Sequence, residues 1–167
     1  MFRKGLLIAL LALVLPESAI AQGTIFVVRH AERADTKTGA PAMMASDPEL
    51  SDAGHARAAS LASMLKEARI TAIFVTEYKR TQQTAAPLAK ALGLTPTVVL
   101  AKELASLTAI LKKADRNALV VGHSNTVPDV ITALGVQTPV SVSDTEFDNL
   151  FIVTLQPTPQ AIHLRYR

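Results

Sequence analysis

Hydrophobic residues along the chain follow two alternating patterns. Short apolar runs, typical of strands, cover residues 24–28, 71–75, 96–100, 118–121, 150–155 and 161–166. Apolar residues at three- and four-residue spacing, together with helix start and stop signals, predict helices over 51–68, 80–92, 103–114 and 128–134. Strands alternating with helices predict an α/β fold, a three-layer α/β/α sandwich with a mostly parallel central sheet. The last two runs predict an antiparallel edge pair.

The N-terminus has the pattern of a secretory signal peptide over residues 1–21. A basic start at Arg3 and Lys4 precedes an apolar stretch over 6–15 and small residues at 19–21. A membrane anchor is the alternative, but this stretch is too short to span a bilayer. We therefore expect an exported protein, periplasmic or secreted, with no stable membrane anchor after cleavage. Residues 22–167 would then form a single catalytic domain.

Composition narrows the class of partner. The chain has 167 residues, of which 49% are hydrophobic and only 4% aromatic, which argues against disorder and against base-stacking recognition of nucleic acid. The formal charge of +3 is too small to predict a surface for polyanions. There is no cysteine, which excludes disulfides and a lipoprotein anchor. A preference for anions must therefore come from a local cluster.

Such a cluster is predicted at the carboxyl ends of three strands. The first run ends in Arg29-His30, the second in the segment 76–80, and the fourth in the segment 122–125. In an open parallel sheet, ligands bind beyond the carboxyl ends of the strands. Arg29, His30, Arg80 and His123 would then meet at one edge, and guanidinium groups match phosphate oxygens in shape and charge. The sequence therefore predicts a phosphate pocket.

A mechanism follows from these residue types. Neutral His30 would attack phosphorus and form a phosphohistidine, which water then hydrolyses. Arg29 and Arg80 would hold the phosphoryl oxygens, and their charges would keep His30 neutral. His123 would donate a hydrogen bond to the same group. Asn125 is either a helix cap or a further donor, and no metal or other cofactor is expected.

Several motifs resemble the histidine phosphatase superfamily, in its phosphoglycerate-mutase-like branch. Arg29-His30-Ala31-Glu32 resembles the family's Arg-His-Gly signature, with alanine at the glycine position. The other matching segments are Leu50-Ser51-Asp52-Ala53-Gly54, the stretch 76–85, Gly122-His123 and the stretch 148–151. The resemblance covers residues 24–155. It implies a phosphoglycerate-mutase-like fold and the nucleophile and phosphate-binding roles given above.

The resemblance also has departures. The large insertions that cap the site in mutases and phytases are missing, so the member is small and uncapped. Ser124 follows His123, so the phytase-type acid is absent. The acid of the mutase-like enzymes lies between the second arginine and the second histidine. Glu103 lies in that stretch, and Glu77, just past a strand end, is the alternative.

These features predict a phosphoric monoester hydrolase. A missing acid would favour easily departing groups, as in phosphohistidine, acyl phosphates or aryl phosphates. The expected partner is a phosphorylated small molecule or an envelope glycolipid phosphate, and a phosphoprotein is an alternative. A binding or regulatory module that has lost turnover is the competing hypothesis. A zinc hydrolase using His30 and His123 is disfavoured, because compact ligand spacing is absent.

Three features have simpler interpretations. Glu32 is expected to form a structural ion pair, with a site arginine or with Arg33. Arg33 itself is otherwise expected to be solvated. The polar loop 33–50 is either a mobile rim of the site or a surface excursion.

Overall fold

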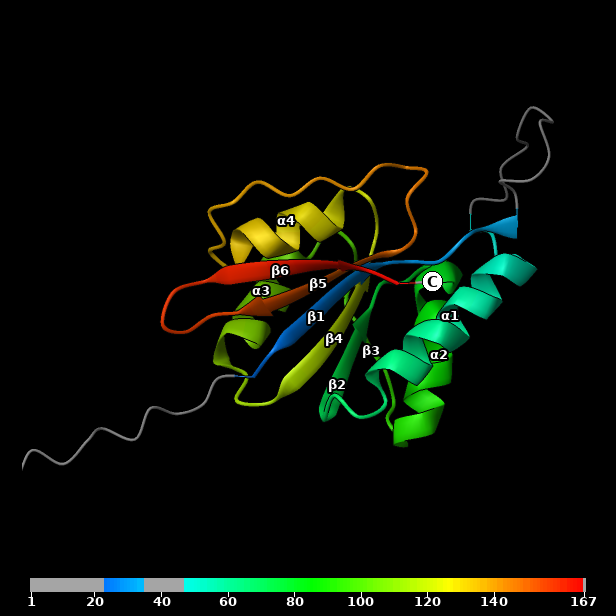
Figure 1. Cartoon of the computed structure of the whole chain (residues 1–167), viewed down its shortest axis with the longest axis horizontal. Helices are drawn as coiled ribbons and strands as arrows, with labels where there is room; N and C mark the ends of the chain where they lie inside the picture. Colours follow the sequence, from blue (N-terminus) through cyan, green and yellow to red (C-terminus); the bar gives the residue numbers. More distant parts are fainter. Residues whose placement is uncertain (1–22, 35–46, 167) are drawn as a thin grey trace, which may run out of the picture.

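A computed structural model describes residues 23–34 and 47–166 (Figure 1). The predicted signal peptide and residues 35–46 of the predicted loop lie outside the described residues. The elements, in chain order, are β1 (Ile25–Arg29), α1 (Asp52–Leu65), β2 (Ile70–Val75), α2 (Lys79–Leu92), β3 (Thr97–Val98), α3 (Leu104–Lys113), β4 (Asn117–Gly122), α4 (Thr126–Ala133), β5 (Asn149–Thr154) and β6 (Gln160–Arg165).

The six strands form one sheet in the order β3-β2-β4-β1-β5-β6. β1 to β4 run parallel, whereas β5 is antiparallel to both β1 and β6. The predicted α/β sandwich with a mostly parallel sheet and an antiparallel edge pair is therefore confirmed. The order also places the carboxyl ends of β2, β4 and β1 side by side.

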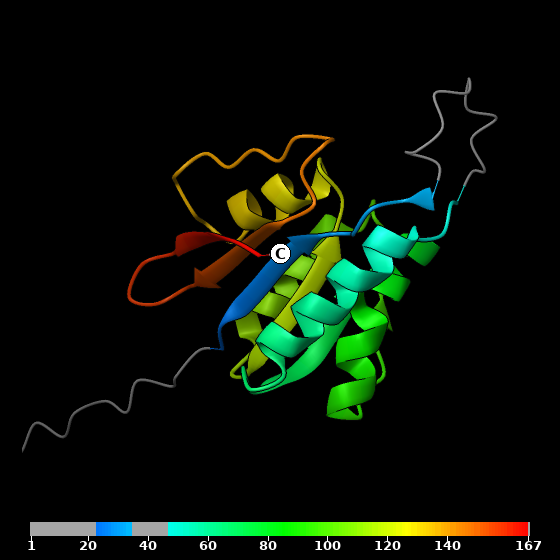
Figure 2. The ribbon, with the colours of Figure 1, turned by 45° about the vertical axis from the view of Figure 1, so that its right-hand side comes forward.

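Alternate side chains of the strands pack into two hydrophobic layers, one on each face of the sheet. In β1, Val27 faces α3 and α4, whereas Phe26 and Val28 face α1 and α2. Figure 2 shows α1 and α2 together on one face, with α4 on the other. Both faces are buried, which is why the central strands are almost continuously apolar.

The predicted element boundaries hold to within a few residues, with local reasons for the differences. Ser51 caps α1, where its hydroxyl accepts a hydrogen bond from the Gly54 amide at 3.2 Å. Gly93 ends α2 with a left-handed φ of 65°. β3 is shorter than predicted, because only Thr97 and Val98 pair with the edge of β2. α4 begins at Thr126, before the predicted Pro128, because the Thr126 hydroxyl accepts a hydrogen bond from the His123 amide at 2.8 Å.

The segment after β1 is tied to α1 and to the C-terminus. Arg57 donates to both carboxylate oxygens of Glu32 and to the carbonyl oxygen of Tyr166, at 2.7–3.1 Å. Burial opposes ionisation of Glu32, but the hydrogen bonds from Arg57 outweigh it and lower the pKa of this carboxyl. A structural ion pair of Glu32 is thus confirmed, but its partner is Arg57 of α1 and not a site arginine as predicted. Figure 1 shows the C-terminus beside α1.

The two ends of the predicted 33–50 loop lie together. Arg33 and Leu50 form an isolated antiparallel bridge, and the Ala34 amide donates to the Glu49 carbonyl at 2.9 Å. The loop therefore leaves and re-enters the fold next to the end of β1. Its entry and exit points are fixed by backbone hydrogen bonds.

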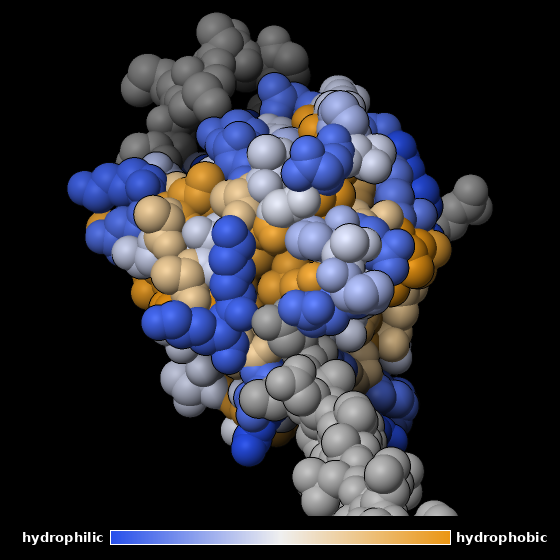
Figure 3. Space-filling view, turned by 90° about the vertical axis from the view of Figure 1, so that its left-hand side faces the viewer, coloured by the Kyte–Doolittle hydropathy of each residue, from blue (hydrophilic) through white to orange (hydrophobic). Residues whose placement is uncertain are grey.

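Figure 3 shows the end of the sheet that lies away from the Arg-His pair, where hydrophilic residues surround a smaller hydrophobic area. Within residues 23–34 and 47–166, none of the helices combines the length and the apolar character needed to cross a bilayer.

Gly54 has a packing reason that can be tested. A Cβ at this position would overlap the carbonyl oxygen of Glu32, just beyond the Arg-His pair. Gly54→Ala should therefore lower the free energy of unfolding by about 1–3 kcal/mol through overpacking, although alanine favours helix. Urea unfolding followed by circular dichroism measures this. Ala59→Ser, at an exposed position of α1, is the control and should change stability by less than about 0.5 kcal/mol. An unchanged midpoint for Gly54→Ala would contradict the packing argument.

Candidate active site

The site begins where β1 and β4 end together. Arg29 is in register with Gly122, and the His30 amide donates to the Gly122 carbonyl at 2.9 Å. This bond extends the ladder by one residue, so the side chains of His30 and His123 follow from adjacent strand ends. Their ring centroids are 5.3 Å apart. The predicted meeting of the two histidines is what the structure shows.

His30 is held as a neutral imidazole with one nitrogen free to react. Its side chain is 3% exposed, and its Nδ1 lies 2.8 Å from the Ala31 carbonyl oxygen. Because a carbonyl only accepts, Nδ1 must carry the proton and Nε2 keeps its lone pair. Burial, together with the charges of Arg29 and Arg80, lowers the pKa of His30 to about 3. The hydrogen bond to Ala31 acts in the opposite direction and raises this pKa, but it is outweighed. The imidazole is therefore unprotonated at neutral pH, a state in which its Nε2 can act as a nucleophile.

The turn after His30 is supported by α2. The Ala31 amide donates to the Thr84 hydroxyl at 2.9 Å, and that hydroxyl donates to the Arg80 carbonyl at 2.7 Å. One buried threonine thus links the backbone behind His30 to the helix that carries Arg80. Thr84 belongs to a matched motif, but the sequence alone did not give it this role.

Arg29 is buried and held from behind by the loop that precedes β5. Its Nη1 donates to the carbonyl oxygens of Ser143 at 2.8 Å and Glu146 at 3.0 Å. The Phe147 ring lies 4.1 Å from its guanidinium carbon. Burial lowers the pKa of Arg29, but a guanidinium stays charged in proteins. Its Nε is buried without a hydrogen-bond partner among the described residues.

Arg80 enters from the first turn of α2. Its guanidinium carbon lies 4.2 Å from the centre of the Tyr78 ring, and its Nη1 is 3.6 Å from Asp47 Oδ1. The Asp47 carboxylate also accepts the Lys79 amide at 3.0 and 3.2 Å. Asp47 therefore accepts a hydrogen bond from a backbone amide at the start of α2 and also holds the Arg80 side chain in place. No sequence signal distinguished Asp47 from the other polar residues of its loop.

His123 faces Arg80 on one side and a threonine pair on the other. Arg80 Nη2 lies 3.4 Å from His123 Nδ1, and His123 Nε2 lies 3.1 Å from the Thr76 hydroxyl. Because a guanidinium only donates, Nδ1 of His123 accepts its hydrogen bond. The single ring proton is therefore on Nε2, which donates a hydrogen bond to the Thr76 hydroxyl. Burial, and then the charge of Arg80, lowers the pKa of His123 to about 4. The predicted donation from His123 to a phosphoryl group therefore needs a second proton at Nδ1 or a turned ring.

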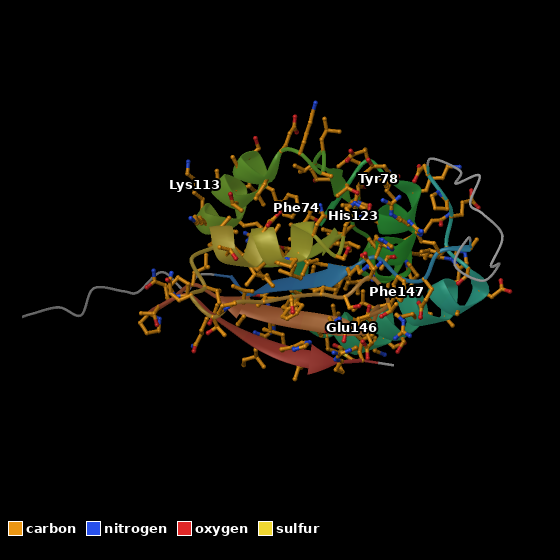
Figure 4. All side chains as sticks on the ribbon, turned by 90° about the horizontal axis from the view of Figure 1, so that it is seen from above. Phe74, Tyr78, Lys113, His123, Glu146 and Phe147 are labelled. Carbon is orange, nitrogen blue, oxygen red and sulfur yellow. The ribbon has the colours of Figure 1, made fainter. Side chains whose placement is uncertain are left out.

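These side chains open into one pocket with a volume of about 450 Å³. Figure 4 shows Tyr78 and His123 beyond one side of β1, and Glu146 and Phe147 toward the side of β5. The lining comprises Arg29, His30, Arg33, Tyr78, Arg80, Ala101, Lys102, His123, Ser124, Asn125, Thr126 and Asp144. Four of these described side chains are cations and one is a carboxylate. The pocket is built for an anion and has room for more than a phosphoryl group.

Arg33, which was expected to be solvated, is partly exposed and also lies in this lining. Its position comes from the bridge to Leu50, which turns the chain after β1 along the pocket rim. Its charge lowers the pKa of Arg29. Asn125 also lines the pocket and occupies the N-cap position of α4, where its side chain makes no capping hydrogen bond. It is thus placed as a site residue rather than as a side-chain cap.

The two predicted acids lie elsewhere. The Glu77 carboxylate accepts the Ala101 amide at 2.8 Å and is outside the pocket lining. Glu103 is the N-cap residue of α3 and lines a separate, apolar pocket between β2, β4 and α3. Neither of these two carboxylates lines the pocket, although the charge of Glu77 acts on His123. The carboxylate that does line the pocket is Asp144, beside Arg29, and the sequence did not single it out.

No set of three or more histidine, aspartate or glutamate side chains is arranged to hold a metal ion within the described part of the chain. The charge that faces the pocket comes from its arginines and from Lys102.

The fold is shared with solved phosphatase structures. The protein histidine phosphatase SixA, complexed with tungstate, is 20% identical, with a TM-score of 0.62 over 86% of this chain and 95% of SixA. A mycobacterial glucosyl-3-phosphoglycerate phosphatase is 14% identical, with a TM-score of 0.63 over 86% of this chain and 98% of its own. A search of the curated proteins found no significant match.

The sequence profile of the histidine phosphatase superfamily (branch 1) matches residues 25–105. This stretch contains Arg29, His30 and Arg80, and His123 joins them through the pairing of β4 with β1. The matched profile and the fold agree with the resemblance to the histidine phosphatase superfamily noted in the sequence.

Proposed function

We propose that this protein is a metal-independent phosphatase that hydrolyses phosphomonoesters through a phosphohistidine on His30. The observation that carries the proposal is the bare Nε2 of a buried, neutral His30 in a pocket lined by four cations. A neutral imidazole is a nucleophile, and guanidinium groups around it bind the group that it attacks.

The reaction has two steps. His30 Nε2 forms a bond to phosphorus while the bond from phosphorus to the leaving group breaks. Arg29 and Arg80 stabilise the charge on the phosphoryl oxygens in the transition state. Water then attacks phosphorus, the bond to Nε2 breaks, and phosphate leaves.

The substrate proposal is a small phosphorylated molecule, with phosphohistidine and acyl phosphates as further substrates. The open pocket of about 450 Å³ supports a ligand larger than phosphate, and a phosphoprotein could present its modified side chain there. The solved relatives named above are a protein histidine phosphatase and a phosphatase of a glucosylated phosphoglycerate. Export through residues 1–21, itself a proposal, would place an envelope glycolipid phosphate or a nutrient phosphomonoester within reach.

The nucleophile can be tested with a pair of histidine variants. His30→Ala should lower kcat for p-nitrophenyl phosphate and acetyl phosphate by at least about 10³-fold, because the covalent route is lost. Assays in the presence of EDTA, and trapping of an acid-labile phosphoenzyme in the wild type, measure this. The matched control is His55→Ala, on the exposed surface of α1, which should keep wild-type activity.

Three outcomes would overturn the proposal. Activity that survives in His30→Ala would exclude this nucleophile. Thermal stabilisation of the wild type by phosphate or vanadate without any turnover would instead favour the binding module, and activity lost to EDTA would show a metal requirement.

The low pKa of His30 predicts an unusual pH profile. An imidazole with an ordinary pKa near 6.5 would lose about 30-fold in its unprotonated fraction at pH 5. Burial and neighbouring cations lower the pKa of His30 to about 3, so protonation should remove the nucleophile only as the pH falls toward that value. Corrected for substrate ionisation, kcat/KM for p-nitrophenyl phosphate should therefore lack a loss at pH 6.5. A decline with an apparent pKa near 6.5 would refute this interpretation of His30.

A further inference from the structure

The loop between α4 and β5 brings a carboxylate to the pocket. The Asp144 Oδ1 accepts a hydrogen bond from the Ser124 hydroxyl at 2.5 Å and lies 3.9 Å from Arg29 Nη2. Its side chain is 87% exposed, so the carboxylate stands at the mouth of the pocket, in contact with solvent. It is thus linked to both sides of the opening, the end of β1 and the start of α4.

The loop holds Asp144 through a built turn. Arg29 donates to the carbonyl oxygens of Ser143 and Glu146, the residues on either side of the turn. The Glu146 carboxylate accepts the Ser143 amide at 3.1 Å and pairs with Arg165 of β6 at 2.6 Å. Because these contacts come from opposite sides, the backbone that carries Asp144 is fixed with respect to the phosphate-binding arginine.

The position of Asp144 matches the side on which a leaving group would depart. His30 is buried at the base of the pocket, and in-line displacement sends the leaving group away from the nucleophile. That direction runs from the base toward the open mouth. Of the other two carboxylates considered for proton transfer, Glu77 accepts a hydrogen bond from the Ala101 amide and Glu103 stands at the start of α3, and neither lines the pocket.

We propose that Asp144 is the catalytic proton donor and acceptor of this site, an inference that rests on the proposed phosphatase function. The monoanion of the substrate brings the proton. Its phosphoryl group, bound at Arg29, would lie beside the Asp144 carboxylate, so that a proton can pass between the two.

The proton is conserved over the two steps. In the first step, Nε2 of His30 bonds to phosphorus, the bond from phosphorus to the ester oxygen breaks, and the Asp144 proton moves to that oxygen to release an alcohol. In the second step, water oxygen bonds to phosphorus, the bond from phosphorus to Nε2 breaks, and one water proton returns to Asp144. The sum is ester plus water giving alcohol plus phosphate.

The test is a comparison of leaving groups in Asp144→Asn. An alkoxide needs a proton to depart, whereas p-nitrophenolate does not. The variant should lose about 10²–10³-fold in kcat/KM for glycerol phosphate and less than about 10-fold for p-nitrophenyl phosphate. The amide oxygen introduced by the substitution can still accept from Ser124, so the loop is retained. Asp129→Asn, an exposed acid in the first turn of α4 and outside the pocket lining, is the matched control and should leave the ratio unchanged.

Three results would overturn the assignment. An equal loss for both esters would indicate positioning rather than proton transfer. A gain for both would show that the carboxylate merely competes with phosphate for Arg29. A change in the ratio in Glu77→Gln or Glu103→Gln, but not in Asp144→Asn, would place the acid elsewhere. In each case, His30-dependent hydrolysis by the wild type would leave the proposed function intact, and its absence would refute both.

Discussion

A single backbone hydrogen bond, from the His30 amide to the Gly122 carbonyl, fixes the geometry on which the site depends. It carries the parallel pairing of β1 and β4 one residue past the strands, so that both histidines start from the same edge. β5 pairs with the other side of β1 in the opposite direction. Its amino end, rather than its carboxyl end, therefore reaches the pocket, and the loop carrying Asp144 and Phe147 arrives with it.

The electrostatics of the site follow from how its arginines are held. Arg29 is bound from behind by two neutral carbonyl groups and an aromatic ring, and its one carboxylate contact is 3.9 Å long. Its charge is therefore positioned without being neutralised. Burial beside such cations disfavours imidazolium, which explains why the pKa of both His30 and His123 is low. The neutral state of His30 and the undiminished positive charge of Arg29 thus have the same structural cause.

The sequence predicted the parts of this arrangement that depend on local patterns. Apolar runs, Ser51 as a cap and Gly93 as a stop gave the layers, and residues at strand ends gave Arg29, His30, Arg80 and His123. It did not predict contacts made by loops. Arg33 reaches the pocket, and Asp47 reaches Arg80, beside a bridge between residues far apart in the chain, whereas Asp144 reaches the pocket through the loop before an antiparallel strand. Neither route leaves a periodic signal, so the sequence pointed to Glu77 and Glu103 as acids instead.

The place of the acid also changes what the pocket could hydrolyse. A pocket with only arginines and histidines favours groups that leave without a proton, such as the imidazole of phosphohistidine or an acyl group. With Asp144 as proton donor, the same pocket would also hydrolyse alkyl phosphomonoesters through His30. On this argument the residues at the base of the pocket set the reaction, whereas the turn from Ser143 to Phe147 sets the class of substrate. Phosphohistidine and ordinary phosphomonoesters would then be separated by one loop that lies outside the matched profile, which ends at residue 105.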